Sequence, residues 1–393
     1  MKIVKLSELC KMQSGGTPSR RYPKFWDNGY IPWAKISDLE TSNDGYIYNT
    51  VELITEEGLK SINNRFFKKD TLLLAMYGSV GKTAISKIEL ATNQAILGIN
   101  ILDEDKLSLK YLKYWFTTIK NELLNRAVGV ALQNISLGIV KDLEIPLPSL
   151  STQNTIASKL DKAQEIISYN KQLVEKYDQF TQSLFIDMFG DPVDNQKEWP
   201  LQKLKTGIKN LQSGLSLSGE ERLINDDEIA VLKISAVTSG IFKSTEHKVV
   251  NKLEIKRSII FPKKGDLLFS RANTREKVGA VAIVDKDYDN LFLPDKLWRI
   301  DTNDLLNNVF LKFVLSHKGF RHNIEKVSTG TSGSMLNISM QKFLNIESPF
   351  PPMHLQNQFA DRIEKIEIQR QLAQETLAKS EHLFQSLLKE SFK

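Results

Sequence analysis

Apolar residues recur at alternating spacings of three and four positions in two stretches of the chain. One stretch runs from Ile156 to Met188 and the other from Phe359 to Leu387. This spacing places the apolar side chains in one stripe along a helix, and it is typical of helices that pair in a coiled coil. The pattern therefore predicts two long helices of about 36 residues each, on the order of 54 Å in length at the α-helical rise.

A set of apolar positions forms the predicted seam between these helices. They are Ile156, Leu160, Ile167, Val174, Leu184, Ile363, Ile366, Leu377 and Leu387. Asn170 and Arg370 interrupt the stripe, and a polar residue in such a seam fixes register at some loss of stability. A single stripe would also suit a surface helix packed on its own domain. Two matched stripes in one chain favour helices that pack antiparallel against each other.

A region of mixed pattern precedes each long helix. Short apolar or β-branched runs predict strands over residues 71–76, 83–88, 95–102, 259–261 and 280–284. Helical spacing predicts helices over residues 109–125 and 308–321. Prolines at 146 and 148, and again at 349 and 351, disfavour helix just before each long one. Each region is therefore predicted to be an α+β domain.

The sequence contains an internal repeat that covers most of the chain. Asn134-Ile135-Ser136 recurs as Asn337-Ile338-Ser339, 203 positions later (337 minus 134). The same offset relates the proline pairs and the residues of the two long helices without a gap. Lys35-Ile36-Ser37 recurs as Lys233-Ile234-Ser235 at an offset of 198 (233 minus 35). Small changes of offset between matched blocks indicate loop insertions, so the chain is interpreted as a tandem duplication.

The predicted fold class is α+β. Two α/β domains stand in tandem, separated by two long antiparallel coiled-coil helices with pseudo-two-fold symmetry. The predicted segments are a first globular domain over 1–150, a long helix over 151–190, a linker over 191–198, a second globular domain over 199–352 and a second long helix over 353–393.

Composition and charge exclude several classes of protein. Lysine and arginine number 53 against 47 acidic residues, a net charge of +6 that permits a polyanion partner without requiring one. Cys10 is the sole cysteine and the five histidines show no metal-ligand spacing, so neither a disulfide framework nor a metal site is expected. No signal peptide or membrane span is visible, and a cytoplasmic location is expected.

One stretch resembles the end of a phosphate-binding loop. Gly81-Lys82-Thr83 follows an apolar run, but the glycine that such a loop needs five residues before Gly81 is replaced by Met76. An ATP-binding protein that uses the loop from Gly78 to Thr83 therefore remains an alternative. A coiled-coil scaffold without DNA binding is a second alternative.

Two related domains on a rigid helical bar could read two separated DNA half-sites, since one turn of B-DNA spans about 34–36 Å. Several motifs make this interpretation specific. They are Ser14-Gly15-Gly16-Thr17-Pro18-Ser19, Phe25-Trp26, Ile31-Pro32-Trp33 and Lys35-Ile36-Ser37-Asp38-Leu39, then Asn134-Ile135-Ser136, Ile145-Pro146-Leu147-Pro148 and Gln153. In order and in duplication the chain resembles the specificity subunit of type I restriction-modification systems. The second copy lacks the Gly-Gly-Thr-Pro-Ser string, which suits a different half-site.

This resemblance implies a noncatalytic DNA-recognition subunit with two target-recognition domains. The implied partners are double-stranded DNA, two modification (methyltransferase) subunits and two restriction subunits that act as ATP-dependent translocase and nuclease. S-adenosylmethionine, ATP and Mg would belong to those partners, and no cofactor is expected in this chain. No amino-methyltransferase string of the Asn-Pro-Pro-Phe type occurs in the sequence.

Direct readout of base edges uses Arg, Lys, Asn and Gln, whereas phosphate contacts need only positive charge. The predicted DNA-binding residues are Arg20, Arg21, Lys35 and Lys82 in the first domain and Lys233, Arg271, Arg275, Lys277 and Lys296 in the second. Gln133-Asn134 and Leu336-Asn337 are expected to cap helices rather than to read bases.

Overall fold

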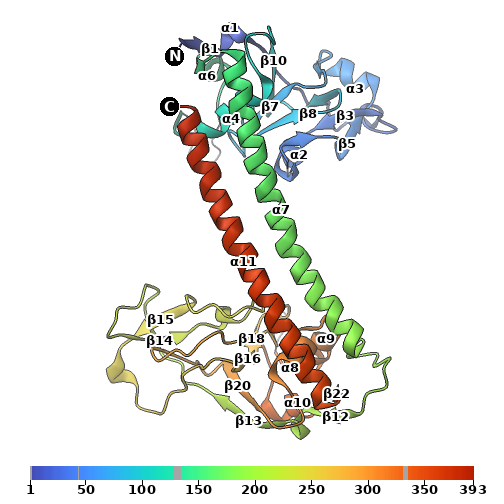
Figure 1. Cartoon of the computed structure of the whole chain (residues 1–393). Coiled ribbons are helices and arrows are strands. Elements are labelled where there is room, and N and C mark those ends of the chain that lie inside the picture. Colours follow the sequence, from blue (N-terminus) through green and yellow to red (C-terminus); the bar gives the residue numbers. More distant parts are fainter. Residues whose placement is uncertain (1, 43, 127–133, 331–334) are drawn as a thin grey trace. The chain divides into compact units, whose positions relative to one another are not determined.

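The computed structural model describes residues 2–42, 44–126, 134–330 and 335–393. The chain divides into two compact units (Figure 1). Unit 1 comprises Met1–Lys171 and Glu375–Lys393, and unit 2 comprises Gln172–Gln374. Each of the two long helices, α7 (Leu150–Phe189) and α11 (Met353–Ser391), therefore contributes one end to each unit.

Unit 1 holds two main sheets and a two-stranded ladder. The first sheet has the order β2 (Cys10–Ser14), β10 (Ile96–Ile101), β7 (Leu72–Ala75), β8 (Thr83–Ser86) and β4 (Tyr46–Ile47). The second has the order β5 (Glu52–Ile54), β3 (Ile31–Ala34), β9 (Leu90–Thr92) and β6 (Phe66–Phe67), and β1 (Lys2–Lys5) pairs with β11 (Glu144–Leu147). The helices are α1 (Leu6–Leu9), α2 (Ile36–Thr41), α3 (Glu56–Ser61), α4 (Leu109–Thr118), α5 (Lys120–Arg126) and α6 (Leu137–Lys141), with a short 3-10 turn η1 (Pro23–Phe25).

Unit 2 repeats this plan with one strand fewer in each main sheet of its described residues. Its first sheet has the order β13 (Ile208–Ser213), β20 (Leu297–Thr302), β16 (Leu267–Ser270) and β18 (Val281–Ile283). Its second has the order β15 (His247–Val250), β14 (Ile229–Leu232) and β19 (Leu291–Phe292), while β12 (Leu201–Lys203) pairs with β22 (Glu347–Pro349) and β17 (Ala272–Asn273) with β21 (Leu336–Asn337). The helices are α8 (Asn308–Ser316), α9 (Lys318–Val327) and α10 (Met340–Leu344), with 3-10 turns η2 (Leu204–Thr206), η3 (Ile234–Ala236) and η4 (Lys252–Glu254). The tandem duplication read from the sequence is thus a duplication of strand order.

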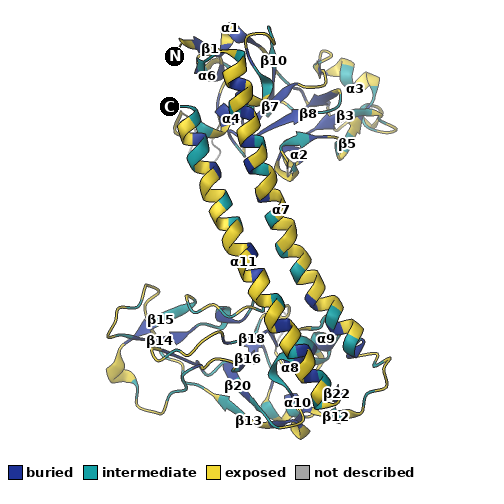
Figure 2. Ribbon diagram, viewed as in Figure 1, coloured by how far each residue is buried: buried dark blue, intermediate teal, exposed yellow. Residues whose placement is uncertain are grey.

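The long helices run in opposite directions where they meet within each unit. In unit 1 the Asn170 amide donates to the Ser380 hydroxyl at 3.2 Å. In unit 2 Arg370 Nε donates to Asp178 Oδ1 at 2.5 Å. From the first of these contacts to the second, the residue number rises on α7 and falls on α11. Figure 2 shows that the buried positions occupy a narrow part of each helix surface. The antiparallel helices of the predicted fold class are confirmed.

The predicted seam residues lie in different environments. Leu160, Ile167 and Ile363 are buried, and Val174 is half-buried on α7. Ile156, Leu377 and Leu387 are partly buried against a cluster of unit 1 that contains Phe384, while Leu184 and Ile366 are partly buried against the core of unit 2.

A buried glutamine fastens the start of each long helix to its own globular part. Gln153 Nε2 donates to the carbonyls of Lys106 and Pro148, and its Oε1 accepts from the backbone N–H of Ser108. Gln356 makes the same three bonds, to the carbonyls of Leu305 and Pro351 and from the N–H of Asn307. Both side chains are fully buried, so each satisfies polar backbone groups that water cannot reach.

The predicted strands over 71–76, 83–88, 95–102 and 280–284 are confirmed as β7, β8, β10 and β18. The prediction over 259–261 is wrong, because this segment precedes Pro262, which has no N–H to extend a ladder. The helices predicted over 109–125 and 308–321 are each two helices, broken at Ile119 and at His317.

The Asn-Ile-Ser motif caps a helix through its serine. The hydroxyls of Ser136 and Ser339 accept from the backbone N–H of Ile139 and Lys342, at the starts of α6 and α10. Asn134 instead bridges to Tyr77, and Asn337 pairs with Ala272 in β17. The capping role expected for the asparagines is therefore wrong, and Gln133 lies outside the described residues.

Candidate nucleic-acid interface

A group of charged and aromatic side chains lies on the second sheet of unit 1. Lys35, which directly follows β3, places its Nζ 2.6 Å from Glu52 Oε1, and Arg20 forms an ion pair with the same carboxylate. Burial alone would raise the pKa of Glu52, but the hydrogen bonds from Lys35 and Arg20 hold it below its ordinary value. The Arg20 guanidinium carbon also lies 3.5 Å from the centre of the Trp26 ring. The structure therefore brings together two of the predicted DNA-binding residues around one carboxylate.

The backbone explains this grouping. The antiparallel pairing of β3 with β5 sets Trp33 opposite Glu52, so a glutamate distant in sequence lies beside the basic residue that follows β3. Trp33 is buried, and its indole N–H donates to the Gly16 carbonyl at 3.0 Å. This bond ties the Gly-Gly-Thr-Pro-Ser segment, which leads to Arg20 and Arg21, to the sheet. Arg21 itself is exposed.

Lys82 lies apart from this group, in the connection between β7 and β8. It lines a pocket together with Lys113 of α4 and Lys120 of α5. Gly78 and Gly81 adopt positive φ angles of 71° and 82° here, and β8 returns antiparallel to β7 with Leu74 opposite Thr83. A phosphate-binding loop instead leads from a strand into the N-terminus of a helix. The context that the ATP-binding interpretation requires is therefore not present at residues 78–83.

In unit 2 the basic residue at the matched position is also held by acids. Lys233, which directly follows β14, lies 3.2 Å from carboxylate oxygens of both Glu221 and Glu246. The hydrogen bonds to Glu221 and then Glu246 raise the pKa of Lys233. The lysines that follow β3 and β14 therefore share an ion-paired state, although different segments supply the acids.

The remaining predicted residues of unit 2 fall into two places. Arg271 Nε donates to the Asp295 carbonyl at 2.9 Å, and its backbone N–H donates to the Lys296 carbonyl at 3.1 Å, so Arg271 and Lys296 are neighbours. Arg275 and Lys277 lie in the connection between β17 and β18 and are both exposed. Arg275 Nε lies 3.3 Å from Glu325 of α9.

Five of the predicted cations thus already have an acidic partner: Arg20, Lys35, Lys233, Arg271 and Arg275. Sequence reasoning missed these acids because strand pairing or helix packing brings them in from distant positions. It also missed Lys113 and Lys312, which occupy the same place in α4 and α8. Their common offset of 199 (312 minus 113) is a signal that the duplication contained.

Among the described residues, no group of three or more His, Cys, Asp and Glu side chains is placed to hold a metal ion. In the same part of the chain no helix is both long and apolar enough to cross a membrane. The candidate interface therefore rests on the five ion-paired cations, two in unit 1 and three in unit 2.

Comparison with known proteins defines the class of protein. The model of the type I restriction modification DNA specificity domain matches residues 1–176 and 198–381. The chain belongs to this family. The two matched regions correspond to the two copies of the duplication.

Individual relatives agree with this assignment. The MjaIX specificity subunit of Methanocaldococcus jannaschii is 28% identical over 293 residues, which are 68% of this chain and 66% of that protein, just under two thirds of its length. The EcoKI specificity subunit of Escherichia coli is 24% identical over 94% of this chain and 83% of that protein. The crystal structure of a type I S subunit from M. genitalium shares the fold, with a TM-score of 0.61, 15% identity and coverage of 100% of this chain and 96% of that chain.

Proposed function

We propose that this chain is the noncatalytic DNA sequence-specificity subunit of a type I restriction-modification complex. Each globular domain reads one half of a bipartite, asymmetric target. The observation that carries the proposal is a repeated strand order that bears different polar side chains in its two copies. A shared scaffold suits a common task, and different cations and partners on it suit two different half-sites.

The ion-paired cations support this role. A guanidinium or ammonium that a carboxylate already holds in place is oriented before DNA binds. A phosphate or base edge can then replace that acid or share the cation with it. Arg20, stacked on Trp26, is the best-oriented example in unit 1. In unit 2 Arg271 is held by both the carbonyl and the carboxylate of Asp295, although it follows a different strand.

The partners follow from the same proposal. Two modification subunits dock on the chain and carry S-adenosylmethionine, and two restriction subunits carry ATP and Mg, while this chain holds no cofactor. The complex acts on double-stranded DNA in the cytoplasm. The restriction-modification context comes from the names of the relatives.

Exchange of one globular domain tests the central claim. Residues 1–145 are replaced by the corresponding region of a related specificity subunit, and the methylated sites of the host genome are mapped by sequencing. One half of the recognised sequence is expected to change while the other half stays. The matched control replaces residues 199–348 and should change the opposite half. A change in both halves, or in neither, contradicts the two-reader proposal, and a chain that binds its subunits but no duplex would be a scaffold.

The long helices are proposed to form a coiled coil that sets the distance between the half-sites. Unit 1 ends at Lys171 on α7 and resumes at Glu375 on α11, so insertions at these two points leave the packing of each unit intact. A heptad inserted at both points adds about 10 Å of helix, or about three base pairs of B-DNA. Methylation mapping should then show the same half-sites with a longer spacer. An active variant with an unchanged spacer would show that the helices do not set it.

A further inference from the structure

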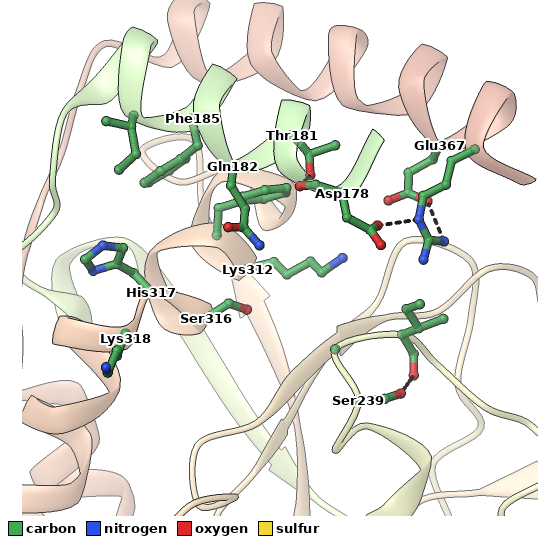
Figure 3. Close-up of a pocket in the computed structure, with 15 residues that line it drawn as sticks. Asp178, Thr181, Gln182, Phe185, Ser239, Lys312, Ser316, His317, Lys318 and Glu367 are labelled. Atoms are coloured by element: carbon green, nitrogen blue, oxygen red, sulfur yellow. Dashed lines mark hydrogen bonds and ion pairs between the residues drawn. The ribbon is translucent and has the colours of Figure 1, made fainter. Parts of the chain in front are cut away.

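A pocket of about 630 Å³ in unit 2 opens where α7 and α11 meet the globular part (Figure 3). Its wall includes Ser239 and Gly240, which follow η3, and Lys312 and Ser316 of α8. Thr181 of α7 and Glu367 of α11 complete the wall from the side of the long helices. Figure 3 shows Lys312 extending from α8 into the space between α7 and the segment that carries Ser239.

Unit 1 contains a matching pocket of about 260 Å³, the same pocket that Lys82 and Lys120 line. Asp44 and Gly45, just before β4, line it together with Lys113 and Thr117 of α4. Gln164 of α7 and Phe384 of α11 face the same space from the long helices. We call the two cavities the lysine pockets of unit 1 and unit 2.

The two pockets are copies of one site. Lys113 matches Lys312 and Thr117 matches Ser316 at the offset of 199 that relates α4 to α8. Gln164 matches Glu367 at the offset of 203 that relates the long helices. Gly45 and Gly240 share a left-handed backbone, with φ angles of 74° and 78°. A Cβ on Gly45 would lie 2.6 Å from Lys113 Nζ, so this glycine makes room for the lysine.

Neither lysine is neutralised by an acid within its pocket. Lys113 Nζ donates to the Asp44 carbonyl at 3.1 Å and lies 4.4 Å from the centre of the Tyr46 ring, while the Asp44 carboxylate accepts from Tyr46 N–H and from the Tyr48 hydroxyl. Among the described residues the Lys312 side chain makes no hydrogen bond or ion pair, and its Nζ lies 5.7 Å from the centre of the Phe313 ring. Burial lowers the pKa of both lysines from the ordinary lysine value.

The acids of the unit 2 pocket are occupied elsewhere. Asp178 accepts from Arg370 Nε at 2.5 Å, and Glu367 lies 3.7 Å from another nitrogen of the same guanidinium. Each pocket therefore presents a recessed ammonium with spare hydrogen-bonding capacity. A carboxylate is the group that would gain most there, because a charge-assisted hydrogen bond strengthens away from water.

The duplication indicates what the ligand is. The polar faces of the two sheets have diverged, yet the central lysine of the pocket is the same in both copies, so the ligand is the same for both halves. A recessed ammonium beside Tyr114 or Phe313 suits a protruding side chain better than the evenly spaced phosphates of a duplex. We propose that each lysine pocket receives an aspartate or glutamate side chain from one of two identical modification subunits. This assignment rests on the proposed function and names the contact through which those subunits dock.

The test uses the full chain, the modification subunit of the same restriction-modification system and native mass spectrometry. The unaltered chain should bind two modification subunits. Lys113→Gln or Lys312→Gln alone should reduce this number to one, and the double variant should reduce it to none. Lys110→Gln, on the same helix as Lys113 but paired with Asp161 at 2.6 Å, and Lys326→Gln on α9 are controls that should keep both subunits.

A second pair of variants keeps the lysines. Thr117→Asp and Ser316→Asp place a carboxylate inside each pocket, so the ammonium is satisfied from within and the incoming acid is excluded. Each should again remove one modification subunit. Circular dichroism melting of every variant establishes that the fold is retained.

Three results would overturn the assignment. Lysine variants that retain two modification subunits show that the pockets do not receive them. Variants that retain both subunits but bind duplex DNA more weakly, with a smaller salt dependence, show phosphate sites instead. An unaltered chain that binds no modification subunit refutes the proposed docking itself, and this assignment with it.

Discussion

Unit 1 and unit 2 share a strand order, but the side chains at the contact between α7 and α11 differ in polarity between the two units. Ile167 of unit 1 is buried beside Phe384, whereas the residue at the matched position in unit 2 is Arg370, which is 9% exposed and bonded to Asp178. Phe384 in turn matches Thr181 of unit 2. The substitutions go together, so an apolar contact in one unit corresponds to a polar contact in the other.

What has not diverged is equally informative. Gln153 and Gln356 make the same three hydrogen bonds to backbone groups. Side chains that pack against side chains can change in pairs, but a side chain that satisfies buried backbone cannot, because the backbone polar groups remain whatever the sequence becomes. The comparison of the two units therefore distinguishes two kinds of position. Residues that bond to buried backbone groups are the same in both units, whereas residues that pack against other side chains differ.

The largest expected effect is a loss of stability that is equal in the two units. Gln153→Ala and Gln356→Ala each leave buried backbone groups without a partner and should each lower the free energy of unfolding by about 3 kcal/mol. Urea denaturation followed by circular dichroism measures both. Gln182→Ala, at an exposed position, is the control and should change stability by less than about 0.5 kcal/mol. A loss below about 1 kcal/mol in one unit alone would show that the two contacts are not equivalent.

The next effect separates the units. Cys10, the sole cysteine, is buried in unit 1, and burial raises the pKa of its thiol to about 12. The thiol should stay unreactive towards Ellman's reagent at pH 8 until unit 1 opens, since the thiolate is the reactive form. Gln153→Ala should speed the reaction about tenfold or more, in line with its effect on stability. Gln356→Ala should leave the rate nearly unchanged, and equal acceleration by both variants would mean that the units open together.

A smaller difference is expected at the helix contacts. Asp178→Ala leaves the buried Arg370 guanidinium without its nearest carboxylate and should lower stability by about 1 kcal/mol. Glu381 occupies the matched position and pairs with Lys171 at 3.0 Å, but both of these side chains are about half exposed. Glu381→Ala should therefore lower stability by less than about 0.5 kcal/mol. Chemical denaturation of the two variants compares them directly, and equal losses would remove the distinction.

The smallest effect asks whether unit 2 tolerates the chemistry of unit 1. Arg370→Ile introduces the residue type of the matched Ile167 and removes both the charge and its desolvation. Replacing a buried ion pair by an apolar residue is often neutral, so stability should change by less than about 1 kcal/mol in either direction. A loss of several kcal/mol in thermal or urea unfolding would show that Arg370 holds the contact by more than its pairing with Asp178.

The sequence by itself determined the long helices, the duplication and the family. These features are written in local periodicity and in repeated strings, such as Asn134-Ile135-Ser136 and its copy at 337–339, and neither depends on how the chain folds back on itself. The ends of the helices inside the globular domains could not be predicted from the sequence as well. The breaks at Ile119 and His317 fall within continuous helical patterns, where the packing of α5 and α9 overrides local preference.

Only the tertiary structure decided the state of the candidate site. In the sequence Lys35 has no acidic residue that is evidently its partner. The pairing of β3 with β5 places Glu52 beside it, and no local sequence pattern predicts a partner 17 residues away. The same applies to the connection after β7, which antiparallel pairing makes a turn between strands rather than a phosphate loop. Lys113 and Lys312 read as ordinary polar positions on helices until the long helices and the neighbouring turns close around them. Charge and periodicity are properties of the chain, whereas the environment of a charge is set by residues distant in sequence.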